Sequence, residues 1–96
     1  MKLVWLPRAV ADLQEARAYI AEHDPQAARV VAQKIRKLVA HLKARPRLGR
    51  QADVDEIRQI SVPGLPYLIP YRVKDGRIEI LRVFHTAQER PENWKD

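Results

Sequence analysis

The chain of 96 residues contains no cysteine, which excludes disulfide bonds and thiolate metal sites and fits a reducing compartment. Its 3 glycines lie isolated at positions 49, 64 and 76, so no glycine-rich loop that could cradle a phosphate is present. The apolar run near the N-terminus stops at Pro7, far short of a signal-peptide core or a membrane span. We therefore expect a cytoplasmic protein that has no membrane partner.

The size and the composition predict one small globular domain over residues 1–96. A chain of this length has room for a single hydrophobic core and not for two. With 46% hydrophobic and 31% charged residues, the composition is typical of a folded protein and not of a disordered one.

Positive charge is concentrated in the first half of the chain. Residues 1–50 carry 11 Lys+Arg against 4 Asp+Glu, whereas residues 51–96 carry 7 against 8. Residues 25–52 carry eight Lys+Arg and no acid. Such a block predicts a surface that binds an acidic protein or nucleic-acid phosphates, and the alternative is a solvated helix face. The residues we predict to bind a partner are Arg29, Arg36, Lys43, Arg47, Arg50 and, from the C-terminal tail, Trp94.

Two helices are predicted after a short first strand at residues 2–6, which Pro7 ends. Asp24 and Pro25 are typical of the start of a second helix, which we expect to run to about Ala44. The stripe of the first helix is Val10, Leu13, Ala16 and Ile20, and that of the second is Ala28, Val31, Ile35, Leu38 and Leu42. These spacings predict a helical hairpin.

Residues 45–56 are predicted to form a loop, because Pro46 ends the helix and Gly49 permits a turn. Three strands are predicted to follow, at 57–62, 67–73 and 77–85. The expected class is α+β, with an N-terminal edge strand, a helical hairpin and then an antiparallel three-stranded meander.

The Asp75-Gly76 pair predicts a two-residue hairpin turn and so fixes a register. In that register Lys74 faces Arg77, Arg72 faces Glu79 and Ile69 faces Arg82. Pro70 lies inside the middle strand, which indicates a bulge or an edge at that point.

Catalytic motifs are few. The histidines at 23, 41 and 85 are too scattered to form a ligand motif, so we expect no metal and no cofactor. The later strands do carry a set of cationic and aromatic groups, and such groups can cleave RNA without a metal. The set is Arg58, Tyr71, Arg72, Arg82 and His85. In the alternative interpretation Arg72 pairs with Glu79, Tyr71 is a core residue and His85 caps the end of its strand.

Several motifs, in this order and spacing, resemble the RelE/ParE toxin superfamily of bacterial toxin-antitoxin modules, and look most like its ParE branch. They are W-x-P-x-A-x-x-D-L at 5–13, Y-I-A at 19–21, L-x-x-x-P-x-x-G-R at 42–50, I-R-Q-I-S-V-P-G at 57–64, P-Y-R-V at 70–73 and I-L-R-V-F-H at 80–85.

The resemblance implies a growth-inhibiting toxin of a type II module, neutralised in a hetero-oligomer by a cognate antitoxin whose acidic C-terminal segment wraps around it. Toxins of the ParE type act on DNA gyrase and need no catalytic residue of their own, whereas relatives of the RelE type are ribosome-dependent mRNA endonucleases. We expect gyrase poisoning. The alternatives are mRNA cleavage of the RelE type and an inactive relative that only binds an antitoxin.

The choice between the two activities depends on a few positions. Arg58, Arg82 and His85 match three roles of the RelE-type nuclease, and Glu56 could act as its base. The segment before Arg58, D-V-D-E, has no lysine, and Thr86 stands where some nucleases have a tyrosine. We therefore predict relic or structural roles for Arg82 and His85.

Overall fold

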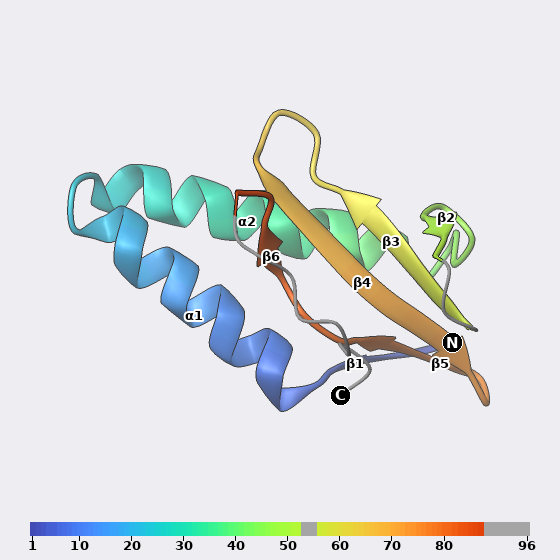
Figure 1. The fold of residues 1–96 in the computed structure, drawn as a ribbon. Coiled ribbons are helices and arrows are strands. Elements are labelled where there is room, and N and C mark those ends of the chain that lie inside the picture. Colours follow the sequence, from blue (N-terminus) through green and yellow to red (C-terminus); the bar gives the residue numbers. More distant parts are fainter. Residues whose placement is uncertain (53–55, 88–96) are drawn as a thin grey trace.

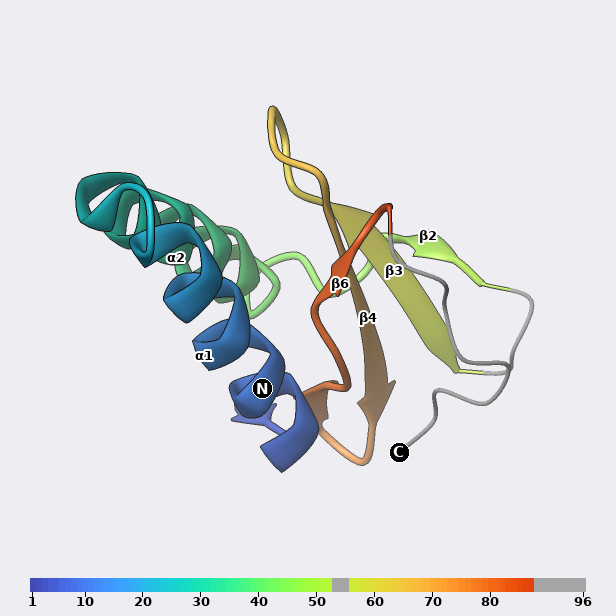
Figure 2. The same ribbon diagram turned by 60° about the vertical axis from the view of Figure 1, so that its left-hand side comes forward.

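The structure, a computed structural model, describes residues 1–52 and 56–87. Its elements are β1 (Lys2–Trp5), α1 (Pro7–Ala21), α2 (Pro25–His41), β2 (Arg50–Gln51), β3 (Ile57–Ser61), β4 (Tyr67–Lys74), β5 (Arg77–Ile80) and β6 (Phe84–His85). The two helices lie side by side along one face of the sheet (Figure 1), and the view in Figure 2 separates the helical layer from the sheet layer. This arrangement confirms the predicted α+β class.

The helices begin where proline and capping residues predict. Pro7 occupies the first turn of α1, and Pro25 that of α2. The carboxylate of Asp24 accepts a hydrogen bond from the backbone N–H of Ala27 at 3.0 Å, which satisfies one of the free amides at this helix end. α2 ends at His41, three residues before the predicted end.

The buried stripes differ slightly from the predicted ones. In α1, Ala9 is fully buried, whereas Val10 is 38% exposed, because the face that meets the core runs through Ala9, Leu13 and Ala16. In α2 the fully buried positions are Ala28, Ala32, Ile35, Val39 and the adjoining Leu42, and the predicted Val31 and Leu38 lie at the border of that arc.

Replacing Asp24 by alanine should lower the free energy of unfolding by about 1 kcal/mol, because the Ala27 amide loses its acceptor. Urea denaturation followed by circular dichroism measures the difference. Asp24→Asn is the matched control, since asparagine caps helices about as well as aspartate. An equal loss in both variants would assign the effect to the charge and not to the cap.

The sheet has the strand order β1-β5-β4-β3-β2, with β6 also paired to β4. β1 runs parallel to β5 at one edge, and the other pairs are antiparallel. β2 corrects the prediction of a loop over 45–56, since Arg50 and Gln51 pair with Gln59 and Arg58 of β3. Two residues are too few to show an alternating pattern in a sequence.

The hairpin between β4 and β5 has the predicted register. Asp75 and Gly76 both have positive φ, at 53° and 73°, as a two-residue turn of this kind requires. Lys74 pairs with Arg77 and Arg72 with Glu79. The Nε of Arg72 donates to the Glu79 carboxylate at 2.8 Å, so the expected cross-strand ion pair is present.

The predicted continuous strand 77–85 is wrong, because it breaks between β5 and β6. Tyr71 pairs with Ile80, but Leu68 pairs with Phe84, so one extra residue bulges between them and the expected Ile69–Arg82 pairing is lost. Pro70 explains the break: its carbonyl accepts from the N–H of Leu81 at 3.0 Å, but proline has no N–H to return. Since β4 is a central strand, Pro70 marks a bulge and not an edge.

Candidate functional site

Arg82 lies in the bulge between β5 and β6, where its guanidinium binds the carboxylate of Asp12 in α1. Nε donates to Oδ2 at 2.7 Å and Nη2 donates to Oδ1 at 3.0 Å. The backbone N–H of Val83 donates to the same carboxylate at 2.9 Å. The hydrogen bond with Asp12 raises the pKa of Arg82, against burial, which lowers it. Arg82 thus joins the helical layer to the sheet through a two-pronged contact.

Arg58 in β3 and Tyr71 in β4 hold the loop that follows α2. Nη1 of Arg58 donates to the carbonyl of Gly49 at 2.9 Å. The hydroxyl of Tyr71 accepts from the N–H of Gly49 and donates to the carbonyl of Pro46, both at 2.8 Å. Burial raises the pKa of this hydroxyl, against the Gly49 hydrogen bond and the charge of Arg58, which lower it. A protonated phenol is what the bond to Pro46 needs.

His85 in β6 lies against Tyr67 of β4. The two rings meet edge to face, with their centroids 5.4 Å apart, which is a favourable aromatic geometry. Nδ1 of His85 accepts from the N–H of Ala87 at 3.1 Å. His85 therefore organises the end of its strand, in agreement with the structural interpretation of this residue.

Glu56 stands immediately before β3 in a left-handed conformation, with a φ of 65°. Its carboxylate lies 3.8 Å from Nζ of Lys74, and both side chains are about half exposed, so the pair adds little stability. Glu56 and Arg58 border the same pocket, of about 300 Å³.

The four residues considered for a nuclease do not converge. Arg58 lies opposite Tyr71 on one side of β4, and His85 lies opposite Tyr67 on the other side. These two points differ by four residues, or roughly 13 Å, along the strand. Arg82 binds Asp12 instead of facing Arg58. In the part of the chain that the structure describes, Glu56 and Arg58 thus border one pocket, whereas His85 and Asp12, the partner of Arg82, border another.

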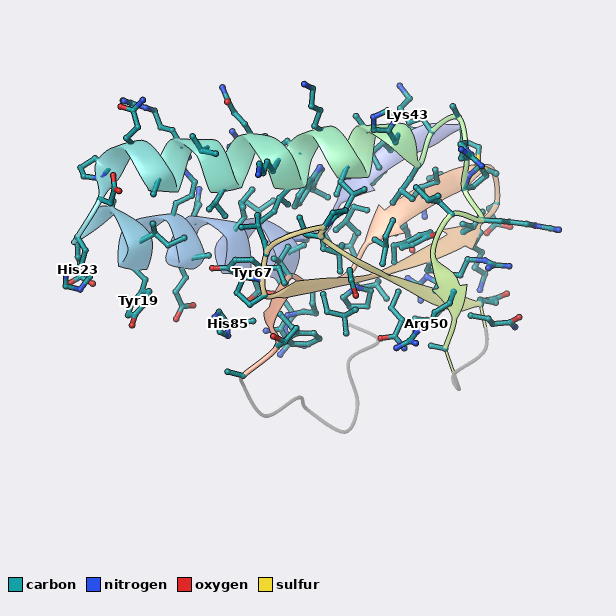
Figure 3. The ribbon with its side chains drawn as sticks, turned by 90° about the horizontal axis from the view of Figure 1, so that it is seen from above. Tyr19, His23, Lys43, Arg50, Tyr67 and His85 are labelled. Atoms are coloured by element: carbon teal, nitrogen blue, oxygen red, sulfur yellow. The ribbon has the colours of Figure 1, made fainter. Side chains whose placement is uncertain are left out.

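The residues predicted to bind a partner are distributed around the surface. Arg29 and Arg36 lie on α2, Lys43 lies just beyond its end, Arg47 lies in the loop and Arg50 lies in β2; all five are exposed. Figure 3 shows Lys43 on the outer side of α2 and Arg50 beside β2, on a different side. Trp94 lies outside the described residues.

A second surface feature, not predicted from the sequence, is a cleft of about 620 Å³ between α1, the start of β4 and the end of β6. We call it the acidic cleft. Its polar and aromatic lining residues are Asp12, Glu15, Tyr19, Glu22, Tyr67 and His85, and Ala16, Ala18 and Val83 complete the lining. Figure 3 shows Tyr19, Tyr67 and His85 on the side of the molecule away from Lys43. In the sequence, the pattern that relates to this cleft is the spacing of Glu15, Tyr19 and Glu22 on one face of a helix. That pattern alone indicates only a polar helix face.

Residues 1–52 and 56–87 contain neither a metal site nor a membrane span. There, no group of His, Asp and Glu side chains is arranged to hold a metal ion. Across the same residues, no helix has the length and hydrophobicity required to span a bilayer.

The fold of the chain matches that of a protein of known structure. It superimposes on a chain of a solved structure titled as the chromosomal ParDE toxin-antitoxin system from P. aeruginosa, with a TM-score of 0.79 and 32% identity over 88% of this chain and 95% of the other. This likeness agrees with the order of elements and with the helical hairpin on one face of the sheet.

Sequence relatives and a family model identify the group more closely. The chain is 36% identical to protein Y4kP of Sinorhizobium fredii, over 95% of this chain and 94% of Y4kP, and 37% identical to toxin RelE2 of Caulobacter vibrioides, over 91% and 97%. The model of the "ParE toxin of type II toxin-antitoxin system, parDE" matches residues 3–90. The chain belongs to this family of ParE toxins. The expected RelE/ParE relationship is thereby confirmed.

Proposed function

We propose that this toxin stops growth by poisoning DNA gyrase in the cytoplasm, and that a cognate antitoxin neutralises it in a hetero-oligomer. Membership of the ParE family supports a toxin of this module type. An antitoxin partner is supported by the P. aeruginosa structure, whose title names a ParDE toxin-antitoxin system.

One observation carries the choice of gyrase over RNA cleavage. The guanidinium of Arg82 is bound to Asp12 through two nitrogens, and its side chain is only 18% exposed. To stabilise a phosphorane it would have to leave a charge-assisted pair that also anchors the backbone of Val83. Since Arg58 and His85 also lie far apart, a mechanism that needs no catalytic group of this chain suits the arrangement best.

The exposed cations of α2 and the following loop supply a surface for the acidic antitoxin segment. Arg29, Arg36, Lys43, Arg47 and Arg50 take part in none of the ion pairs seen in residues 1–52 and 56–87. Ion pairs across a partly exposed interface steer association and add specificity. Trp94 remains in the proposal as an aromatic anchor of the tail.

Pulse labelling after induction without antitoxin tests the target. Thymidine incorporation should fall within the first minutes while amino-acid incorporation continues. Purified chain added to gyrase and supercoiled plasmid should then accumulate cleaved DNA. Early loss of amino-acid incorporation, with cleaved mRNA on ribosomes, would establish the RelE-type activity instead. Inhibition of neither process would indicate an inactive relative.

His85→Ala should leave toxicity largely intact, because this side chain is expected to support the strand end and not to carry out chemistry. The readout is colony formation after induction, with thermal unfolding to establish that the variant is folded. Thr86→Ala, at the exposed neighbouring position, is the matched control. Complete loss of toxicity in folded His85→Ala, with Thr86→Ala still toxic, would overturn this assignment.

A further inference from the structure

The acidic cleft has a charge opposite to that of the molecule as a whole. The chain carries a formal net charge of +6, yet the cleft contains the carboxylates of Asp12, Glu15 and Glu22. Asp12 is bound to Arg82, and Glu15 lies close enough to that guanidinium to contribute to its raised pKa. Among the described residues, three carboxylates and no lysine or arginine line the cleft, and Arg82 pairs with only one of those carboxylates, so the cleft favours a positively charged ligand.

The exposed wall of the cleft has a simple geometry. Glu15 and Tyr19 in α1 and Glu22 at its C-cap follow one another at spacings of four and three residues, so they lie along one face of the helix. Tyr19 is 69% exposed and stands between the two carboxylates. An aromatic ring flanked by acids is suited to the alkyl stem and charged end of an arginine or lysine side chain.

The floor of the cleft contains a polar group without a partner. Tyr67 is only 7% exposed, and within the described residues its hydroxyl makes no hydrogen bond. Burial raises the pKa of this hydroxyl, and so does the nearby Tyr19, so the hydroxyl stays protonated and can both donate and accept a hydrogen bond. Since this side chain is more than nine-tenths buried and borders the cleft, its unpartnered hydroxyl points independently to a ligand that donates a hydrogen bond. His85 fixes the Tyr67 ring from the other side.

We infer that the acidic cleft receives one arginine or lysine side chain from a segment of the antitoxin. The cation lies between Glu15 and Glu22, an N–H donates to the Tyr67 hydroxyl, and the stem packs on Tyr19. The identity of the occupant rests on the proposed function. The proposed function already includes a contact between acids of the antitoxin and the basic surface of α2. The cleft adds a second contact in which the charges are reversed, so the antitoxin segment carries acids for one surface and a cation for the other.

This pairing would also provide specificity. An acidic segment alone could bind any basic surface, whereas a segment that lacks the cation would leave two carboxylates and a phenol unpaired when it covers the cleft. The cleft therefore discriminates among antitoxins that are similarly acidic.

NMR titration of the full-length 15N-labelled chain tests the inference directly. The probe is a short acetylated and amidated peptide, Ala-Leu-Arg-Ala-Leu, and its control has citrulline, a neutral isostere, in place of arginine. The arginine peptide should cause saturable shifts of the amides of Glu15, Tyr19 and Glu22. The citrulline peptide should bind about tenfold more weakly, since it loses the charge but not the shape.

Matched variants separate the cleft from general charge. Glu22→Gln should weaken the arginine peptide severalfold, whereas Glu56→Gln, an exposed carboxylate outside the cleft, should have no effect. Equal binding of both peptides, shifts confined to other surfaces, or no saturable shift would overturn the inference. Neither the plasmid cleavage assay nor the labelling assay uses the cleft. A chain that poisons gyrase but ignores the peptide refutes only the cleft, and one that binds the peptide but spares gyrase refutes only the proposed target.

Discussion

Replacing Asp12 by alanine should lower the free energy of unfolding by about 2 to 3 kcal/mol, because the change leaves a mostly buried guanidinium without its counter-ion. The Asp12 carboxylate accepts two hydrogen bonds from Arg82 and one from the N–H of Val83. Its side chain is 15% exposed and that of Arg82 18%, so water can replace only part of the loss. Urea denaturation of the purified variant measures the difference.

A double-mutant cycle identifies the pair as the cause. Arg82→Met removes the charge but keeps much of the alkyl chain, and adding it to Asp12→Ala should recover part of the lost stability, since no unpaired cation remains. Glu15→Ala, on the same helix and exposed, is the control and should change stability by less than about 0.5 kcal/mol. A loss in Asp12→Ala no larger than that of Glu15→Ala would show that the contact contributes nothing measurable.

The sequence predicted those features that depend on neighbouring residues. The Asp75-Gly76 turn and the Asp24 cap are both present, because each depends on the conformation of a few adjacent residues. This turn also predicted the Arg72–Glu79 pair, because the turn sets the register of the hairpin. Pro70 indicated an irregularity in the ladder but did not decide between a bulge and an edge.

The features that the sequence did not predict depend on residues distant in the chain. Asp12 and Arg82 are 70 positions apart, and each alone looks like an ordinary surface charge. The acidic cleft needs α1, β4 and β6 together, so the single-helix pattern of Glu15, Tyr19 and Glu22 indicated no site. The opposite error also occurred: the later strands suggested one cluster of Arg58, Arg82 and His85, but the bulge and the contacts with other elements separate these residues.

Replacing Gly49 by alanine should lower the free energy of unfolding by about 2 to 3 kcal/mol, through overpacking. A Cβ at this position would lie 2.7 Å from Cε1 of Tyr71 and 2.8 Å from the carbonyl oxygen of Gln59. The Gln59 oxygen belongs to the backbone of β3, and the Tyr71 ring is fully buried, so neither can move away at low cost. The displaced loop should also shift Arg47 and Arg50 and so weaken antitoxin binding. Urea denaturation measures the first effect and a binding assay the second.

Two further variants separate steric crowding from lost hydrogen bonds. Tyr71→Phe removes the bonds to Gly49 and Pro46 without adding volume, and should cost about 1 to 2 kcal/mol. In the double variant the Cβ no longer meets the hydroxyl oxygen, which lies 2.8 Å away in the native arrangement, so the combined loss should be smaller than the sum of the two single losses. Strict additivity would mean that the Tyr71 hydrogen bonds survive in Gly49→Ala and that the added Cβ does not crowd the hydroxyl. In that case the hydrogen bond from Arg58 to Gly49 should survive as well, and Arg58→Met should cost as much in the alanine background as in the native chain.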